Sequence, residues 1–345
     1  LVDLESIDNK DLYSYESLYK HVTSRLCRGK KNYVIIDEVQ NCRDFQKAID
    51  SLYIKNDVDL YITGSNAHIL SGELATLLSG RYITIELLPF SFKEYIAAVK
   101  NEDSLEKKFR DYIRYGAFPY VPTFNGNEKQ INNYLEGLYN TVFKKDIIER
   151  YKISDAAMLE DIIKFLFDNI GNPVSSNKIS NTLTSNHRKI SQPTVENYLS
   201  FLANSYLLYK VGRYDIKGKE YLKSLSKYYI ADIGLRNYLL GYKGLDRGRV
   251  LENIIYLELR RRGYKIYTGK VGSSEVDFIA TLHGQTQYYQ IAQTVSAGET
   301  LERELAPLRG IKDFNQRFLI TLDYDANKSY DGIKHLNALE FLTEK

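Results

Sequence analysis

Apolar residues near the start of the chain form short continuous runs that end abruptly in polar residues. Residues 33–36 precede Asp37 and Glu38, and residues 60–62 precede Thr63-Gly64-Ser65-Asn66. A continuous apolar run is typical of a strand that is covered on both faces of a parallel sheet. The pattern therefore predicts an α/β fold with polar residues at the carboxyl ends of its strands.

Helical periodicity links these runs. Apolar residues form one stripe along residues 45–53, which predicts the helix of a right-handed strand–helix–strand crossover in one parallel sheet. Residues 12–27 predict a helix before the first strand. Residues 83–88 predict a further strand, and Ser91 is a candidate cap for a helix over residues 92–99.

The middle of the chain is predicted to be mainly helical from residue 105 to 165, with a break at Tyr115-Gly116-Ala117-Phe118-Pro119. A winged helix has three helices and a β-hairpin, and this order is predicted over residues 158–169, 176–183, from 191, 207–213 and 221–230.

The last part of the chain alternates between helices and strands. The turn at His283-Gly284 places Asp277 opposite Gln290 on neighbouring strands. The predicted order is a helix over residues 249–262, strands over 265–268, 275–282 and 288–293, a helix over 299–308 and a strand over 317–322.

Length, composition and charge restrict the number of domains and the class of protein. A length of 345 residues suits two or three domains, and 43% hydrophobic with 26% charged residues is ordinary for globular proteins. A net charge of +3 is too small to indicate a nucleic-acid partner by itself. No apolar run approaches membrane-span length, and two cysteines without framework spacing favour a reducing cytoplasm.

The acidic pair at the end of the first apolar strand suggests nucleotide hydrolysis. Ligands of parallel sheets bind beyond the carboxyl ends of the strands. There Asp37 would hold Mg²⁺ through water, Glu38 would polarise the attacking water, and Ser65 or Asn66 would sense the γ-phosphate. The alternative is a buried strand whose end is capped by carboxylates, and the acidic pair alone does not decide between the two.

Four motifs in order carry a resemblance to a known family. They are Ile-Ile-Asp-Glu-Val-Gln, Ile-Thr-Gly-Ser-Asn, Leu-Ser-Gly-Arg-Tyr and Leu-Pro-Phe-Ser-Phe-Lys-Glu-Tyr. The chain resembles a prokaryotic family of AAA+ P-loop ATPases with C-terminal domain of unknown function 4143. The resemblance implies ATP and Mg²⁺ as ligands, a catalytic arginine at Arg81, and a helical lid at the break around Gly116. It also implies that Arg81 faces nucleotide in its own subunit or across a homo-oligomer interface.

One part of the family pattern is missing. P-loop ATPases hold phosphate with Gly-x-x-x-x-Gly-Lys-Ser/Thr, and the 345 residues contain no such run. The expectation is a truncated AAA+-type sheet whose phosphate loop has been cut away, so that this chain is ATP-incompetent.

The predicted winged helix leaves DNA binding open. Its third helix carries Glu196 and has no lysine or arginine between Ser191 and Ser205, so direct base readout is disfavoured. The hairpin carries Lys217 and Lys219, which would suit non-specific contact with DNA. Packing or protein contact is the alternative role.

The C-terminal part resembles a restriction-endonuclease core that has lost residues. That pattern has a helical Glu, an Asp, and a strand with Glu-x-Lys, which together hold Mg²⁺ and orient water. Glu252 and Asp277 match by place, whereas Gln290 is neutral and Ala292 replaces the lysine. The expectation is a relic cluster in a nuclease-like fold without nuclease activity.

Three functions remain in competition: an AAA+-type ATPase with downstream DNA- or protein-recognition domains, a metal-dependent DNA nuclease, and a non-enzymatic binding module. The expected location is the cytoplasm, with no membrane contact. The predicted domains are a truncated ATPase core over residues 1–100, a helical lid over 101–154, a winged helix over 155–240 and a nuclease-like α/β domain over 241–345.

Overall fold

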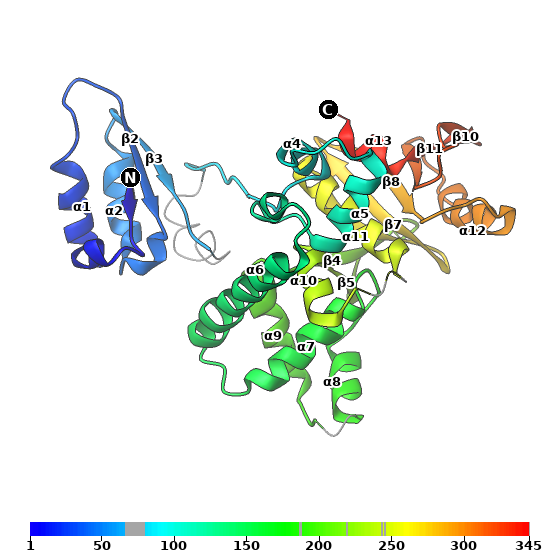
Figure 1. The fold of residues 1–345 in the computed structure, drawn as a ribbon, viewed down its shortest axis with the longest axis horizontal. Helices are drawn as coiled ribbons and strands as arrows, with labels where there is room; N and C mark the ends of the chain where they lie inside the picture. Colours follow the sequence, from blue (N-terminus) through cyan, green and yellow to red (C-terminus); the bar gives the residue numbers. More distant parts are fainter. Residues whose placement is uncertain (66–79, 186–187, 219, 243, 245, 345) are drawn as a thin grey trace. The chain divides into compact units, whose positions relative to one another are not determined.

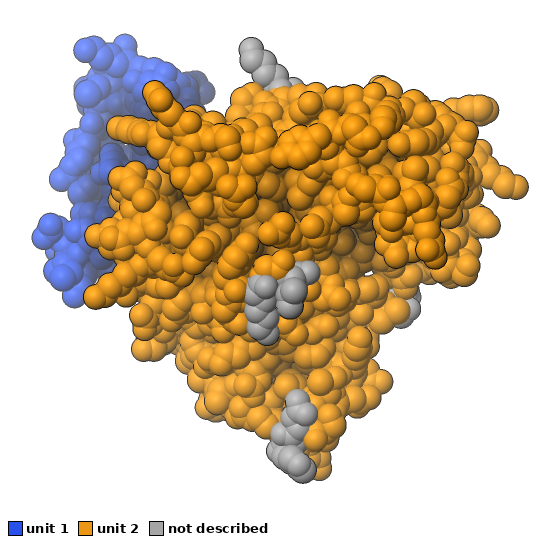
Figure 2. Space-filling model, turned by 45° about the vertical axis from the view of Figure 1, so that its right-hand side comes forward, with its two compact units in different colours: residues 1–86, 204–206 blue, residues 87–203, 207–345 orange. Residues whose placement is uncertain are grey.

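The computed structural model describes residues 1–65, 80–185, 188–218, 220–242, 244 and 246–344, which form two compact units (Figure 1). The first unit contains Leu1–Glu86 with Asn204–Tyr206, and the second contains Leu87–Ala203 with Leu207–Lys345 (Figure 2). Two predicted site residues, Asn66 and Lys219, lie outside the described residues. The four predicted domains stay predictions.

The first unit is built on a parallel sheet of three strands in the order β1-β2-β3 (Figure 1). Leu18 of α1 and Ile49 and Leu52 of α2 form one core with Ile36 of β2. The elements are β1 (Val2–Asp3), a 3₁₀ helix (Ile7–Leu12), α1 (Tyr15–Thr23), β2 (Asn32–Asp37), α2 (Phe45–Tyr53) and β3 (Val58–Ile62). The predicted strand–helix–strand crossover is confirmed.

Two sequence expectations for this unit are wrong in the described residues. The strands are not covered on both faces, because Tyr33 is 67% exposed, Ile35 40% and Tyr61 47%. The predicted strand over residues 83–88 is also absent, and Ile83 and Ile85 are 91% and 75% exposed there. A strand forms only with a partner, and β3 pairs with β2 alone among the described strands.

The second unit combines helices with a large mixed sheet. The predicted helices over residues 92–99, 158–169, 176–183 and 249–262 are confirmed with small shifts at their ends. The helices are α4 (Phe92–Ala98), α5 (Leu105–Tyr115), α6 (Glu128–Thr141), α7 (Ala156–Asp168), α8 (Ser176–Ser185), α9 (Gln192–Asn204), α10 (Ile233–Leu240), α11 (Arg247–Arg261), α12 (Gly298–Arg309) and α13 (Ala338–Thr343). A π-helix over Val142–Glu149 continues α6.

The sheet of the second unit has eight strands in the order β10-β11-β9-β8-β7-β6-β4-β5. These are β4 (Leu208–Asp215), β5 (Glu220–Ile230), β6 (Lys265–Val271), β7 (Ser274–Leu282), β8 (Gln285–Ile291), β9 (Gln316–Thr321), β10 (Lys328–Tyr330) and β11 (Ile333–Asn337). The turn between β7 and β8 has positive φ at His283 (49°) and Gly284 (80°), as a two-residue type I′ turn requires.

The hairpin predicted as a wing belongs to this same sheet. β4 pairs antiparallel with β5 and, at Arg213, Tyr214 and Asp215, parallel with β6. The sequence did not indicate this pairing, which makes the hairpin the edge of the C-terminal sheet. Helix α11 packs against this sheet, and its residues 250–259 are all buried (Figure 1).

A buried carboxylate ties the helical part to the end of β5. Asp232 caps α10 by accepting from the backbone N–H of Leu235 at 3.1 Å, and it also accepts from the N–H of Ala117 at 2.6 Å. Burial raises the pKa of Asp232 to about 6, while these backbone N–H groups oppose the shift. Gly116 has a φ of 85°, and a Cβ there would lie 2.2 Å from a carboxylate oxygen of Asp232.

We predict that Gly116→Ala strongly destabilises the second unit. The control is Gly126→Ala, because Gly126 has a similar φ of 78° and no atom within 4 Å of an added Cβ. The control should cost about 1–2 kcal/mol, the conformational penalty alone. Gly116→Ala should cost roughly 1–3 kcal/mol more, because Asp232 has to move and because a ψ of −172° places Gly116 in a region that is essentially restricted to glycine. If urea unfolding gave the same loss of unfolding free energy for both variants, the contact with Asp232 would not contribute to the effect at Gly116.

Candidate functional site

The carboxyl ends of β2 and β3 bring the predicted acidic pair next to Thr63. The Thr63 hydroxyl donates to Asp37 Oδ1 and accepts from the backbone N–H of Glu38 at 3.2 Å. The Thr63 N–H donates to the carbonyl of Ile36 at 2.9 Å, which continues the ladder between the strands. Asp37 and Glu38 are both half-buried. The sequence places the acidic pair, but it does not single out Thr63.

Glu38 has a left-handed backbone conformation and a side chain whose pKa is shifted. Its φ of 51° lies in the left-handed region, which is costly for a residue with a Cβ. The Gln40 amide donates to Glu38 Oε2. Burial raises the pKa of Glu38 above its usual range, while the hydrogen bond from Gln40 opposes this shift. A carboxylate with a raised pKa at a strand end is suited to accept a proton from water.

The structure does not bring Arg81 together with Asp37 and Glu38. The Arg81 guanidinium pairs with Asp50 of α2 at 3.4 Å and lies over the ring of Tyr53, 5.9 Å from its centroid. Half of the Arg81 side chain is exposed. Ser65 follows the end of β3, as predicted, and its hydrogen bonding favours the charged form of Glu38.

A second group of predicted residues does come together, in the second unit. Asp277 of β7 accepts from the N–H of Ile291 at 2.9 Å, and its own N–H donates to Gln290 Oε1 at 3.4 Å. This geometry confirms the predicted register of Asp277 and Gln290. Glu252 of α11 lies within the same cluster, because both carboxylates contact the ammonium group of Lys227.

Lys227 and Glu275 complete this cluster, and the sequence did not assign them to it. Lys227 lies on the second strand of the predicted hairpin, and its side chain is only 4% exposed. Burial alone would lower the pKa of Lys227, but the charges of Glu252, Asp277 and Glu275 raise it above its usual range. Burial and the charge of Glu252 raise the pKa of Asp277.

Lys217 is exposed in the β4–β5 turn, as a DNA contact requires. The Asp215 carboxylate shapes this turn by accepting from the N–H groups of Lys217 and Gly218, each at 3.0 Å. The side chain of Lys217 is therefore presented to solvent next to an acidic residue.

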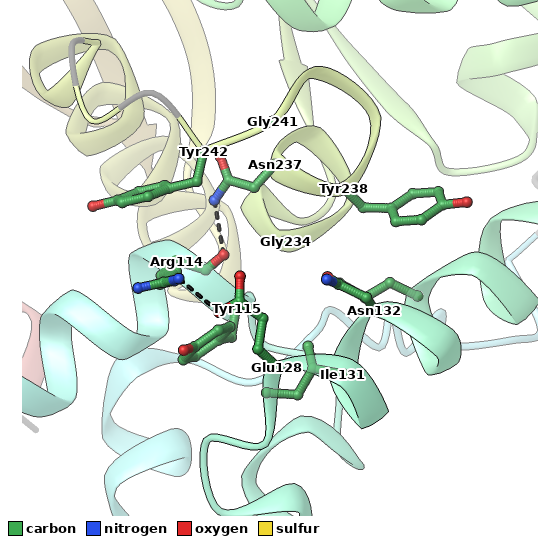
Figure 3. A pocket seen from close by; sticks show the side chains of 11 residues that line it. Arg114, Tyr115, Glu128, Ile131, Asn132, Gly234, Asn237, Tyr238, Gly241 and Tyr242 are labelled. Atoms are coloured by element: carbon green, nitrogen blue, oxygen red, sulfur yellow. Dashed lines mark hydrogen bonds and ion pairs between the residues drawn. The ribbon is translucent and has the colours of Figure 1, made fainter.

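A cavity of about 300 Å³ lies between the end of α5, the first half of α6 and α10 (Figure 3). The Arg114 guanidinium pairs with Glu128 at 2.8 Å and lies over the rings of Tyr115 and Tyr242. Asn237 also lines this cavity and donates to the carbonyls of Ile113 and Arg114 at 2.8 and 2.9 Å. The charged groups here pair with each other, and none of the predicted site residues lines this cavity.

Comparison with known families agrees with the α/β fold of the first unit. An AAA domain matches residues 1–96, and a domain of unknown function, DUF8612, matches residues 106–246. The chain is 41% identical over 319 residues to an uncharacterized protein of Haemophilus influenzae, with 91% of this chain and 78% of that protein covered. The chain therefore belongs to the same family as this uncharacterized protein, and its N-terminal part matches an AAA domain.

Two further similar proteins have lower sequence identity to this chain. An uncharacterized protein of Methanocaldococcus jannaschii, MJ1544, is 31% identical over 271 residues, which cover 73% of this chain and 59% of that protein. The Walker-type ATPase PABY2304 of Pyrococcus abyssi aligns with a TM-score of 0.45 at 14% identity, over 69% of this chain and 83% of that chain. The expected domain of unknown function 4143 is not confirmed. No helix of the described residues is long and apolar enough to cross a membrane.

We predict that Glu38→Gly is more stable than Glu38→Ala by about 1 kcal/mol. Both changes remove the carboxylate, but only glycine adopts the left-handed backbone without a steric penalty. Asp37 is the control, because it lies in β2 with ordinary strand geometry and glycine there should be the less stable substitution. Urea unfolding of the four variants measures both differences. An alanine variant as stable as the glycine variant at position 38 would show that this backbone is unstrained.

Proposed function

We propose that this chain carries the metal- and water-handling half of an AAA-type ATPase site. The observation that supports the proposal most is the arrangement of Asp37, Glu38 and Thr63 at adjoining carboxyl ends of a parallel sheet. Ligands of such sheets bind at that edge. The AAA domain that matches residues 1–96 agrees with it.

In this proposal Asp37 holds Mg²⁺ through water, and Glu38 accepts a proton from the attacking water. The oxygen donors present fit a hard cation, because Mg²⁺ prefers carboxylates and water. The bound Mg²⁺ would neutralise charge on the phosphates of ATP. Thr63 orients the Asp37 carboxylate through its hydroxyl, and it fixes the Glu38 backbone through the same oxygen.

Three further residues of the sequence hypothesis, Ser65, Asn66 and Arg81, are assigned contacts with phosphate. Ser65 follows β3 on the same edge and is assigned the γ-phosphate contact, together with Asn66. Arg81 is assigned a catalytic contact across a homo-oligomer interface, since its half-exposed guanidinium lies on α2 and not at Asp37. An arginine suits this role because its fixed charge stabilises phosphate oxygens.

The phosphate-holding part of such a site is not among these residues, because the sequence has no Gly-x-x-x-x-Gly-Lys-Ser/Thr. Backbone N–H groups of that loop normally cradle the phosphates. We therefore infer that these 345 residues alone bind ATP weakly, and that hydrolysis belongs to the complete protein.

We also propose that the second unit recognises a partner and does not cut DNA. Its α11–β6–β7–β8–α12–β9 order, with Glu252, Asp277 and Gln290 in one cluster, supports a restriction-endonuclease-like fold. The neutral Gln290, the apolar Ala292 and the burial of the cluster argue against catalysis. Cleavage of DNA by the purified chain with Mg²⁺ or Mn²⁺ would contradict this assignment.

We predict that Glu38→Gln in the complete protein stops ATP hydrolysis and leaves ATP binding intact. The amide keeps the size of the side chain but cannot accept the proton from water, so the rate should fall by at least about 100-fold. Thr63→Ser, which keeps the hydroxyl, is the matched control and should retain most of the activity. Phosphate release and fluorescent-ATP binding give the two readouts, and normal turnover by Glu38→Gln would remove the assigned role.

We predict that Lys217→Ala and Lys219→Ala weaken any binding of this chain to duplex DNA and lower its salt dependence. Each lysine that neutralises a phosphate adds roughly one unit to the slope of log affinity against log salt. Lys312→Ala, another exposed lysine of the second unit, is the control and should leave the slope unchanged. Absent or salt-independent binding would leave a protein as the partner of the second unit.

A further inference from the structure

The cluster around Lys227 has the composition of a cation site. The Lys227 Nζ lies 2.9 Å from Glu275 Oε1, 3.0 Å from Glu252 Oε1 and 3.4 Å from Asp277 Oδ1. The lysine comes from β5, Glu252 from α11, and the other two carboxylates from β7. An ammonium group has three N–H donors, and each has one carboxylate to meet here.

Other groups hold these carboxylates in place. The Tyr229 hydroxyl donates to Glu252 Oε1 at 2.6 Å, and the Ile291 N–H donates to Asp277 Oδ2 at 2.9 Å. The Arg213 guanidinium lies 3.5 Å from Glu275. Glu252 and Asp277, the two acids of the predicted nuclease pattern, are thus fixed so that one oxygen of each contacts Lys227 Nζ.

The burial of the cluster makes the ammonium group indispensable. Exposed fractions of the side chains are 4% for Lys227, 11% for Glu252, 13% for Asp277 and 27% for Glu275. Buried carboxylates at such distances repel one another strongly unless a cation lies between them. In the described part of the chain no group of three or more Asp, Glu, His or Cys side chains is arranged to hold a metal ion, and this cluster has an ammonium group between its carboxylates instead. Hard divalent cations bind sets of carboxylates, so removal of the ammonium group would leave the kind of ligand that such an ion prefers.

We propose that Lys227 is an internal cation that occupies the position of a divalent metal between Glu252, Glu275 and Asp277, and thereby excludes metal from this cluster. Without the Lys227 ammonium group, these three carboxylates would form a divalent-cation site. The proposal is independent of ATP hydrolysis by the first unit.

A catalytic role for Lys227 fits the geometry less well. A lysine that orients water for phosphodiester cleavage has to reach solvent and substrate. This amine is nearly inaccessible, and three carboxylates use its donors. These ion pairs therefore link β5, α11 and β7, which come from distant parts of the sequence.

The test compares Mn²⁺ binding and thermal unfolding of the full 345-residue chain and its variants. The wild type should bind no Mn²⁺ at this cluster, so Asp277→Asn should leave the number of bound Mn²⁺ ions unchanged. Lys227→Met should lower the melting temperature without metal. It should gain one saturable Mn²⁺ site, and saturating Mn²⁺ should raise its melting temperature by about 5 °C or more. Adding Asp277→Asn to Lys227→Met should remove this site again.

Two further variants keep the test decisive. Lys210→Met removes an exposed lysine of β4 and should change neither Mn²⁺ binding nor stability. If Lys227→Met does not fold, the triple variant with Glu252→Gln and Asp277→Asn should fold without Mn²⁺, because its cluster needs no cation. The proposal is overturned if the wild type loses a Mn²⁺ ion on Asp277→Asn, if folded Lys227→Met binds no extra Mn²⁺, or if the triple variant fails to fold.

Discussion

The short parallel pairing of β4 with β6 is the contact on which the second unit depends. It covers Arg213, Tyr214 and Asp215, yet it joins a hairpin that follows three helices to a sheet that begins about fifty residues later. Because β5 pairs with β4, Lys227 is carried toward α11 and β7 and becomes a core residue. Helix α11 also holds β5 directly, because the Asn253 side chain bonds both backbone groups of Ile230 at 2.9 and 3.0 Å.

The two units use carboxylates in opposite ways. In the first unit, Asp37 and Glu38 stand half-buried at an open edge of the sheet, where hydroxyl and amide groups orient them without neutralising them. In the second unit, Glu252 and Asp277 are buried and bound to an ammonium group. A carboxylate that is accessible and unpaired with a cation at a strand end can take part in catalysis. A buried carboxylate that is paired with an ammonium group instead links the elements of the core.

Local signals explain what the sequence could predict. The acidic strand, the helix over residues 45–53 and the register of Asp277 with Gln290 all follow from nearby residues, and a two-residue turn at His283 and Gly284 fixes that register. The burial of Lys227 depends on pairing between distant strands, so no local pattern reveals it. The apolar run over residues 83–88 carries a strand signal, but a strand needs a partner that sequence periodicity does not supply. Arg81 was placed by motif order, which carries no information about its contact with Asp50.

The close contacts of Asp232 limit which substitutions the neighbouring positions can accept during evolution. Its carboxylate lies against Gly116 and Gly234, and a Cβ added at Gly234 would come within 2.3 Å of the Tyr115 carbonyl oxygen. A side chain at Gly116 therefore requires Asp232 to move, whereas one at Gly234 meets the Tyr115 backbone as well as Asp232. A smaller residue at position 232 leaves the Ala117 and Leu235 N–H groups without an acceptor. The effects of substitutions at these three positions depend on one another. Relatives that change Gly116 should carry a compensating change at Asp232, whereas the Tyr115 backbone keeps position 234 a glycine in either case.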